Sequence, residues 1–126
     1  MNHLPKLIFV YNANSGKRNS LLDVAHKIMS PSTYACNLCN ITQDVFSEKK
    51  VWKNFKQDSD LEMEFLYKDE FESAYGDRFG YKFMFPIVLT TGVRGLDVLV
   101  STSKLNSLQQ TSQLMNLLRN KLSMAN

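Results

Sequence analysis

Apolar runs alternate with helical periodicities along the chain, which predicts an α/β protein. Residues 6–11 form a continuous apolar run rich in β-branched and aromatic residues, typical of a strand buried on both faces. Residues 20–30 carry apolar side chains at helical spacing behind Ser20, a residue type that caps helices, and Pro31 ends this helix. A strand, a loop and a helix in this order predict the first unit of an α/β fold.

Two short helices and one segment without periodicity are expected in the middle of the chain. Residues 31–46 have no clear period and are predicted to form a loop. Residues 47–57 are expected to form a helix, and Asp69 is expected to cap another, which ends at Gly76. The residues of the first of these helices that are predicted to face inward are Val51, Trp52 and Phe55.

Three further strands are predicted after the first. Residues 61–67 alternate apolar and acidic positions, the pattern of a half-covered strand. Residues 85–91 and 96–101 flank a short turn with two glycines, which predicts an antiparallel hairpin. Ser107 and Gln110 have the spacing of a capping box and are expected to begin a final helix with a leucine-rich inner stripe.

Length and composition favour one soluble domain over residues 1–126, with one hydrophobic core. Hydrophobic residues make up 44% and charged residues 21%, which excludes disordered, collagen-like and coiled-coil classes. The net charge of +3 is a mild excess, so nucleic acid is not an expected partner, whereas a protein partner or a homodimer is left open. No secretory signal or membrane span is visible, so we expect a cytoplasmic location without a membrane partner.

The predicted element order resembles the thioredoxin/glutaredoxin fold. Two βα units are followed by a hairpin and a last helix, and Pro86 falls at the head of the third strand, where that fold carries its cis-proline. The resemblance implies a single thioredoxin-like domain with about four strands in a mixed sheet flanked by helices, a Cys-bearing loop inserted after the first helix, and a groove shaped by Pro86. The whole sequence also resembles a small bacterial protein family without an assigned activity.

Cys36 and Cys39 are the only cysteines and form a Cys-Asn-Leu-Cys pair. Two thiols at this spacing can undergo redox chemistry or supply two ligands of a metal site, with zinc as the candidate, while inert packing thiols are a third interpretation. His26 is the candidate third metal ligand, against the alternative of a surface or core-edge histidine. Thioredoxin-like enzymes carry their pair directly after the first strand, whereas this pair follows the predicted first helix. The family's nucleophile and resolving roles are therefore not transferred to these cysteines.

A polar loop over residues 12–19 lies between the first strand and the first helix, a setting that suits anion binding. Its Gly-Lys dipeptide resembles a P-loop, but Tyr11 replaces the first glycine of that motif and Arg18 replaces its Ser/Thr, so GTPase or ATPase activity is not expected. The alternative to anion binding is an ordinary solvated loop. The candidate anion-binding residues are Ser15, Gly16, Lys17 and Arg18.

The remaining charged and aromatic groups favour structural roles. The acidic residues around the 61–67 strand are expected to form the solvent side of an edge strand and a helix start. The aromatic residues between 75 and 85 are expected to pack in the core rather than stack on bases. The leading functional hypothesis is thiol redox or metal handling by Cys36 and Cys39. The alternative is a non-enzymatic module that binds an anionic ligand or partner through the 12–19 loop, and whether the protein is an enzyme is left open.

Overall fold

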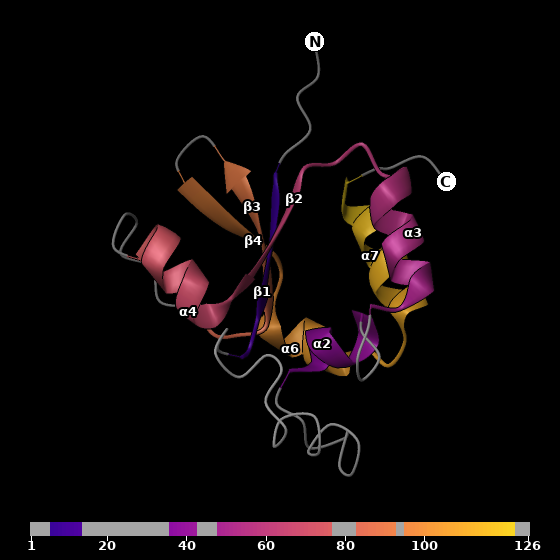
Figure 1. Ribbon diagram of the computed structural model, residues 1–126, viewed down its shortest axis with the longest axis horizontal. Coiled ribbons are helices and arrows are strands. Elements are labelled where there is room, and N and C mark those ends of the chain that lie inside the picture. Colours follow the sequence, from indigo (N-terminus) through magenta and orange to yellow (C-terminus); the bar gives the residue numbers. More distant parts are fainter. Residues whose placement is uncertain (1–5, 14–35, 43–47, 77–82, 93–94, 123–126) are drawn as a thin grey trace.

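A four-stranded mixed sheet forms the centre of the computed structural model, which describes residues 6–13, 36–42, 48–76, 83–92 and 95–122 (Figure 1). In sheet order β2-β1-β3-β4, β1 is parallel to β2 and antiparallel to β3, and β3 and β4 form an antiparallel hairpin. This arrangement confirms the α/β class, the mixed sheet and the hairpin. The strands are β1 (Leu7–Tyr11), β2 (Met63–Tyr67), β3 (Ile87–Gly92) and β4 (Gly95–Val100).

β1 is buried on both faces, as its continuous apolar run predicts. All five of its residues are at most 5% exposed. Leu7, Phe9 and Tyr11 face one hydrophobic cluster, and Ile8 and Val10 face another. Because side chains alternate across a strand, one short run of sequence supplies the centre of both layers.

Four of the described helices cover the face of the sheet that contains Phe9 (Figure 1). Trp52 of α3 is fully buried there, with its ring 5.6 Å from that of Phe9 in an edge-on arrangement. Leu114 and Leu118 of α7 are also fully buried in this cluster. The helices are α2 (Asn37–Thr42), α3 (Lys50–Asp58), α6 (Thr102–Ser107) and α7 (Thr111–Leu122).

The opposite face is covered by α4 (Lys68–Phe71) and the π-helical turn η3 (Glu72–Gly76) that continues it. Phe71 is the centre of this layer, since the rings of Tyr75, Phe83 and Phe85 all lie 5.4–5.9 Å from its own. Tyr75, Phe83 and Phe85 therefore pack against the core, as the sequence predicted, whereas Phe79 and Tyr81 lie outside the described residues.

Two short helices lie where none was predicted. α2 occupies part of the segment expected to be a loop, so that prediction is wrong for residues 37–42. α6 precedes the final helix, and Ser101 caps it by accepting the N–H of Lys104 at 3.2 Å. Each helix has only six residues, too few for an apolar period to be visible in the sequence.

The predicted helix starts at Ser107 and Asp69 are also wrong. Ser107 ends α6, and α7 begins at Thr111. α4 follows Tyr67, whose N–H donates to the Glu70 carboxylate at 2.9 Å, so Asp69 lies inside the first turn rather than at the cap. In both cases a residue type that suits an N-cap lies within three residues of the position that precedes the helix. Sequence preference alone does not choose between the two positions.

The inward face of α3 and the start of β2 differ in detail from the predictions. Trp52 and Phe55 are buried, but Val51 is 49% exposed. β2 begins at Met63, although Leu61 ahead of it is buried in the same cluster. Val51 adjoins Trp52 in sequence, and adjacent residues on a helix do not share a face.

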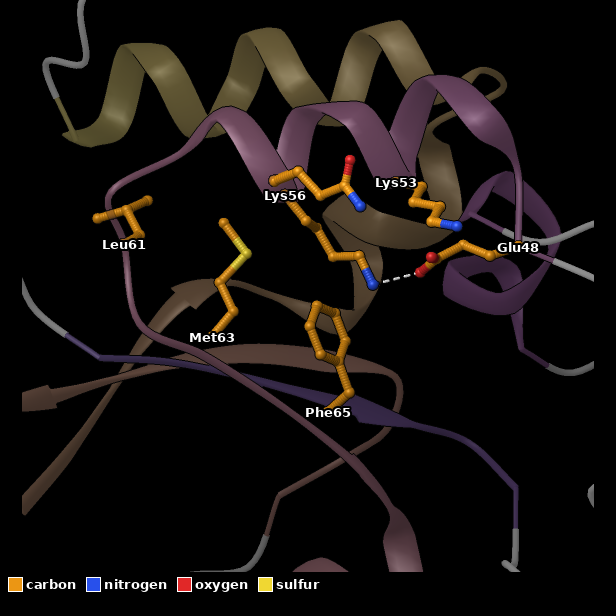
Figure 2. Close-up of a pocket in the computed structure, with 7 residues that line it drawn as sticks. Glu48, Lys53, Lys56, Leu61, Met63 and Phe65 are labelled. Atoms are coloured by element: carbon orange, nitrogen blue, oxygen red, sulfur yellow. Dashed lines mark ion pairs between the residues drawn. The ribbon is translucent and has the colours of Figure 1, made fainter.

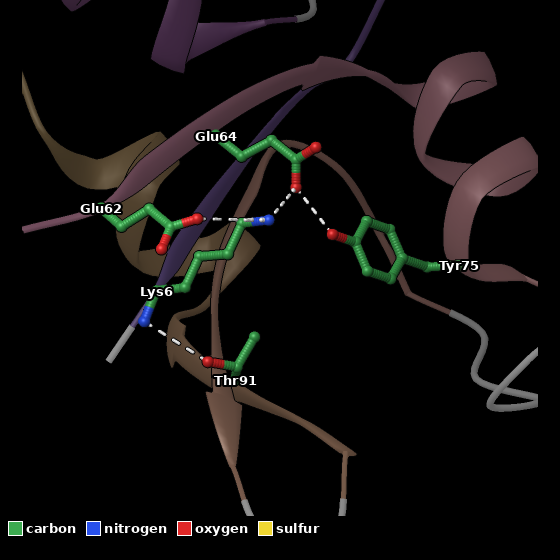
Figure 3. A network of polar contacts seen from close by, with 5 residues as sticks. All are labelled: Lys6, Glu62, Glu64, Tyr75 and Thr91. Atoms are coloured by element: carbon green, nitrogen blue, oxygen red, sulfur yellow. Dashed lines mark hydrogen bonds and ion pairs between the residues drawn. The ribbon is translucent and has the colours of Figure 1, made fainter. Parts of the chain in front are cut away.

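A polar network ties η3 to the start of the sheet (Figure 3). The Tyr75 hydroxyl donates to the Glu64 carboxylate at 2.7 Å, and the Lys6 ammonium lies 3.1 Å from the same oxygen. The bond from Tyr75, together with Lys6, holds the pKa of Glu64 below its ordinary value of 4.5. Burial and the bond to Glu64 raise the pKa of Tyr75 above 10.0, and the bond to Glu64 raises that of Lys6 above 10.5. Glu64 is therefore more than the solvent side of an edge strand.

We predict that Tyr75→Phe lowers the free energy of unfolding by about 1 kcal/mol at neutral pH, because the ring remains against Phe71 while the bond to a charged group is lost. A carboxyl group with a lowered folded-state pKa stabilises the protein above its unfolded value and loses that effect as pH falls through the folded value. The difference from wild type, measured by urea denaturation, should therefore shrink below pH 4.5.

The matched control is Glu62→Gln. This carboxylate is 73% exposed and lies 3.8 Å from Lys6, so its loss should change stability by less than about 0.5 kcal/mol. A Tyr75→Phe effect that is absent, or equally large at pH 3 and pH 7, would contradict the assigned role of the network.

Candidate thiol site

Cys36 and Cys39 lie at the beginning of α2, with their sulfur atoms at disulfide distance. Cys36 directly precedes the helix, and Cys39 lies in its first turn. Their Cα atoms are 5.3 Å apart, within the range that a disulfide can bridge without backbone movement. The backbone at the start of α2 thus has the geometry that a Cys36–Cys39 disulfide requires.

The sulfur of Cys36 connects the pair to the end of β1. It accepts two backbone N–H groups, from Asn12 and from Cys39, each at 3.3 Å. Asn12 directly follows β1, so Cys36 lies at the carboxyl end of that strand although 24 residues separate the two positions. Figure 1 shows α2 next to this end of β1. The prediction of a Cys-bearing loop is wrong for Cys39, which lies in α2, and the predicted first helix over residues 20–30 lies outside the described residues.

The two residues between the cysteines fix α2 to the protein. The Asn37 amide donates to the carbonyl oxygens of Leu105 at 2.6 Å and Leu108 at 2.8 Å, which joins α2 to α6. Leu38 is fully buried. At the other end of α2, the Thr111 hydroxyl donates to the carbonyl oxygen of Ile41. The Cys-Asn-Leu-Cys sequence is thus both the thiol pair and the attachment point of its helix.

Both sulfur-bearing residues are largely covered. Cys36 is 1% exposed and Cys39 is 6% exposed. Burial limits the size of a reagent that can reach either sulfur in this arrangement. Cys39 is the more accessible residue, and Cys36 is the one whose sulfur receives the N–H groups.

Pro86 lies at the same end of the sheet as the pair. It is buried and directly precedes β3, and the Phe85–Pro86 peptide bond is cis. In the antiparallel pairing of β1 with β3, Val10 is opposite Ile87. Pro86 directly precedes Ile87 and Asn12 follows Val10 by two residues, so both lie at the same end of the β1–β3 ladder.

The other predicted site residues lie outside the described residues. This holds for His26 and for the candidate anion-binding residues Ser15, Gly16, Lys17 and Arg18. Within the described ranges, no three His, Cys, Asp or Glu side chains are grouped so as to hold a metal ion. Anion binding by the loop and metal binding with His26 stay predictions.

Comparison with protein-family models, with curated proteins and with solved structures finds no significant match to this chain. Among the helices that the structure describes, none is long and apolar enough to cross a membrane. The chemistry of the thiol pair therefore has to be argued from its own contacts. The contribution of Asn12, through its backbone, and of Asn37, through its side chain, had no signal in the sequence.

We predict that Asn37→Ala lowers the free energy of unfolding by about 1–3 kcal/mol, because two carbonyl oxygens at the α2–α6 contact lose the amide that binds them. The measurement is urea denaturation of the reduced protein. Asn54→Ala is the control, since Asn54 is exposed on α3, and it should change stability by less than about 0.5 kcal/mol. Equal effects of the two substitutions would show that Asn37 does not anchor α2.

Proposed function

We propose that the protein carries out thiol–disulfide exchange through Cys36 and Cys39. The observation that carries the proposal is the pair of backbone N–H groups directed at the sulfur of Cys36. Hydrogen bonds from N–H groups stabilise negative charge on sulfur, and the thiolate is the reactive form in exchange.

The location of the pair supports a thioredoxin-like reading of the fold. Thioredoxin-like enzymes hold their pair after the first strand and at the beginning of a helix. Here Cys36 contacts the residue after β1 and directly precedes α2. The parallel β1–β2 pair followed by the β3–β4 hairpin agrees with the two βα units and hairpin on which the resemblance rests. We include the cytoplasmic location in the proposal, because a reducing compartment keeps such a pair able to cycle.

In the proposed reaction, the Cys36 thiolate attacks one sulfur of a substrate disulfide. A mixed disulfide forms at Cys36, and the first substrate sulfur leaves and takes a proton from the Cys39 thiol. Cys39 then attacks the Cys36 sulfur, which closes the internal disulfide and releases the second substrate sulfur, protonated from solvent. Two electrons pass from the pair to the substrate, and the reverse sequence oxidises a substrate dithiol.

Burial restricts the substrate. With Cys36 at 1% and Cys39 at 6% exposure, a small disulfide reaches the pair more readily than one held inside a folded protein. The proposal therefore favours low-molecular-weight disulfides or disulfides in extended peptide segments as substrates.

The test uses oxidised glutathione and intact-mass spectrometry of the reduced protein. Wild type should lose two hydrogens without keeping an adduct, because Cys39 resolves the mixed disulfide. Cys39→Ser should accumulate one glutathione adduct on Cys36. Cys36→Ser should form its adduct at least about ten-fold more slowly, because the sulfur that receives the N–H groups is gone.

Two results would replace the proposal. Equal adduct rates for Cys36→Ser and Cys39→Ser, together with a wild type that stays reduced, would make the cysteines structural. A native mass, taken without chelator, that includes a metal ion lost in each variant would assign the pair to metal handling instead.

A further inference from the structure

A pocket of about 380 Å³ opens between α3 and β2 (Figure 2). Its floor is apolar and comes from β2 and from Leu61, two residues ahead of that strand. Its rim is polar and comes mainly from α3. Neither cysteine lines it, so the pocket is separate from the thiol site. The floor consists of Leu61, Met63 and Phe65, and the rim of Glu48, Lys53, Lys56 and Gln57.

The rim carries a surplus of positive charge. The Lys56 ammonium lies over the Phe65 ring, 4.5 Å from its centre, and forms an ion pair with Glu48 (Figure 2). Glu48 therefore balances Lys56. Lys53 is exposed on the same rim and forms no ion pair with another described residue. The complementary occupant carries a negative charge next to an apolar group.

The floor of the pocket is also an open edge of the sheet. β2 is an outer strand, and the Leu7 N–H donates to the Glu62 carbonyl oxygen at 2.8 Å. Since Leu7 is opposite Met63 in this parallel pair, the main-chain groups of Glu62 and Glu64 face β1, and those of Met63 and Phe65 face away from it. The two residues whose side chains form the floor thus present N–H and C=O groups at an edge that no described strand covers.

We propose that this edge binds an extended, acidic segment of a partner protein, which adds to β2 as a further strand. Main-chain hydrogen bonds to Met63 and Phe65 hold the segment. Every second side chain of the segment faces the pocket, so that one of them contacts the apolar floor and a carboxylate two residues along forms an ion pair with Lys53. A small carboxylate would satisfy Lys53 but leave the strand edge unpaired. An extended acidic segment pairs with Lys53 and also forms main-chain hydrogen bonds to the strand edge.

The probe is a capped heptapeptide of sequence Thr-Leu-Thr-Glu-Thr-Leu-Thr, which places Leu, Glu and Leu on one face of a strand. Binding is followed by NMR, together with hydrogen exchange of the protein's amides. We expect saturable binding in which exchange at Met63 and Phe65 slows at least about ten-fold at saturation, because their N–H groups gain partners. Peptides with Lys in place of Glu, or N-methylated at the residues that face β2, should bind at least about ten-fold more weakly.

Lys53→Glu should weaken binding of the heptapeptide about ten-fold, because it reverses the unpaired charge on the rim. Lys50→Glu is the matched control, since Lys50 is exposed on the same helix but does not line the pocket, and it should change affinity less than about two-fold. The proposal is overturned by absence of binding, by binding without slowed exchange at Met63 and Phe65, or by equal effects of the two charge reversals.

Discussion

The burial of β1 on both faces is the constraint on which the rest of the structure depends. A strand with no face in water needs partners for its main-chain groups, which β2 and β3 supply, and cover for both sets of side chains. Among the described elements, α2, α3, α6 and α7 cover one face, and α4 with η3 covers the other. The two ends of β1 then become defined positions, with Lys6 and its carboxylate partners at one end and Asn12 with Cys36 at the other.

The environment of the thiol pair is assembled from three segments that are far apart in sequence. The end of β1 provides a backbone donor, α2 and the residue before it provide the two sulfurs, and α6 with the start of α7 holds α2 in place. Asn37 and Leu38 serve this attachment, which accounts for polar and apolar residues side by side within the pair. Chemistry and anchoring therefore share a stretch of four residues, and a change in one of them affects both.

The side chains on the two faces of the outer strand β2 make different contacts. On one face, Glu64 is held by Tyr75 and Lys6, and on the other, Phe65 is partly covered by the Lys56 ammonium. Charged groups near an edge strand discourage unspecific pairing, whereas an unpaired cation beside an apolar floor favours a partner of opposite charge.

The sequence alone determined those features that depend on local patterns, namely the buried first strand, the alternating β2, the hairpin and the inward positions of Trp52 and Phe55. It did not determine α2 and α6, because six residues show no period and these helices are held by contacts such as Asn37 with Leu105. The Cys-x-x-Cys spacing identified the candidate chemistry. Only the tertiary structure placed Cys36 against Asn12, since a backbone N–H that follows a strand leaves no signature in the amino-acid sequence and acquires a role only when the chain returns to it.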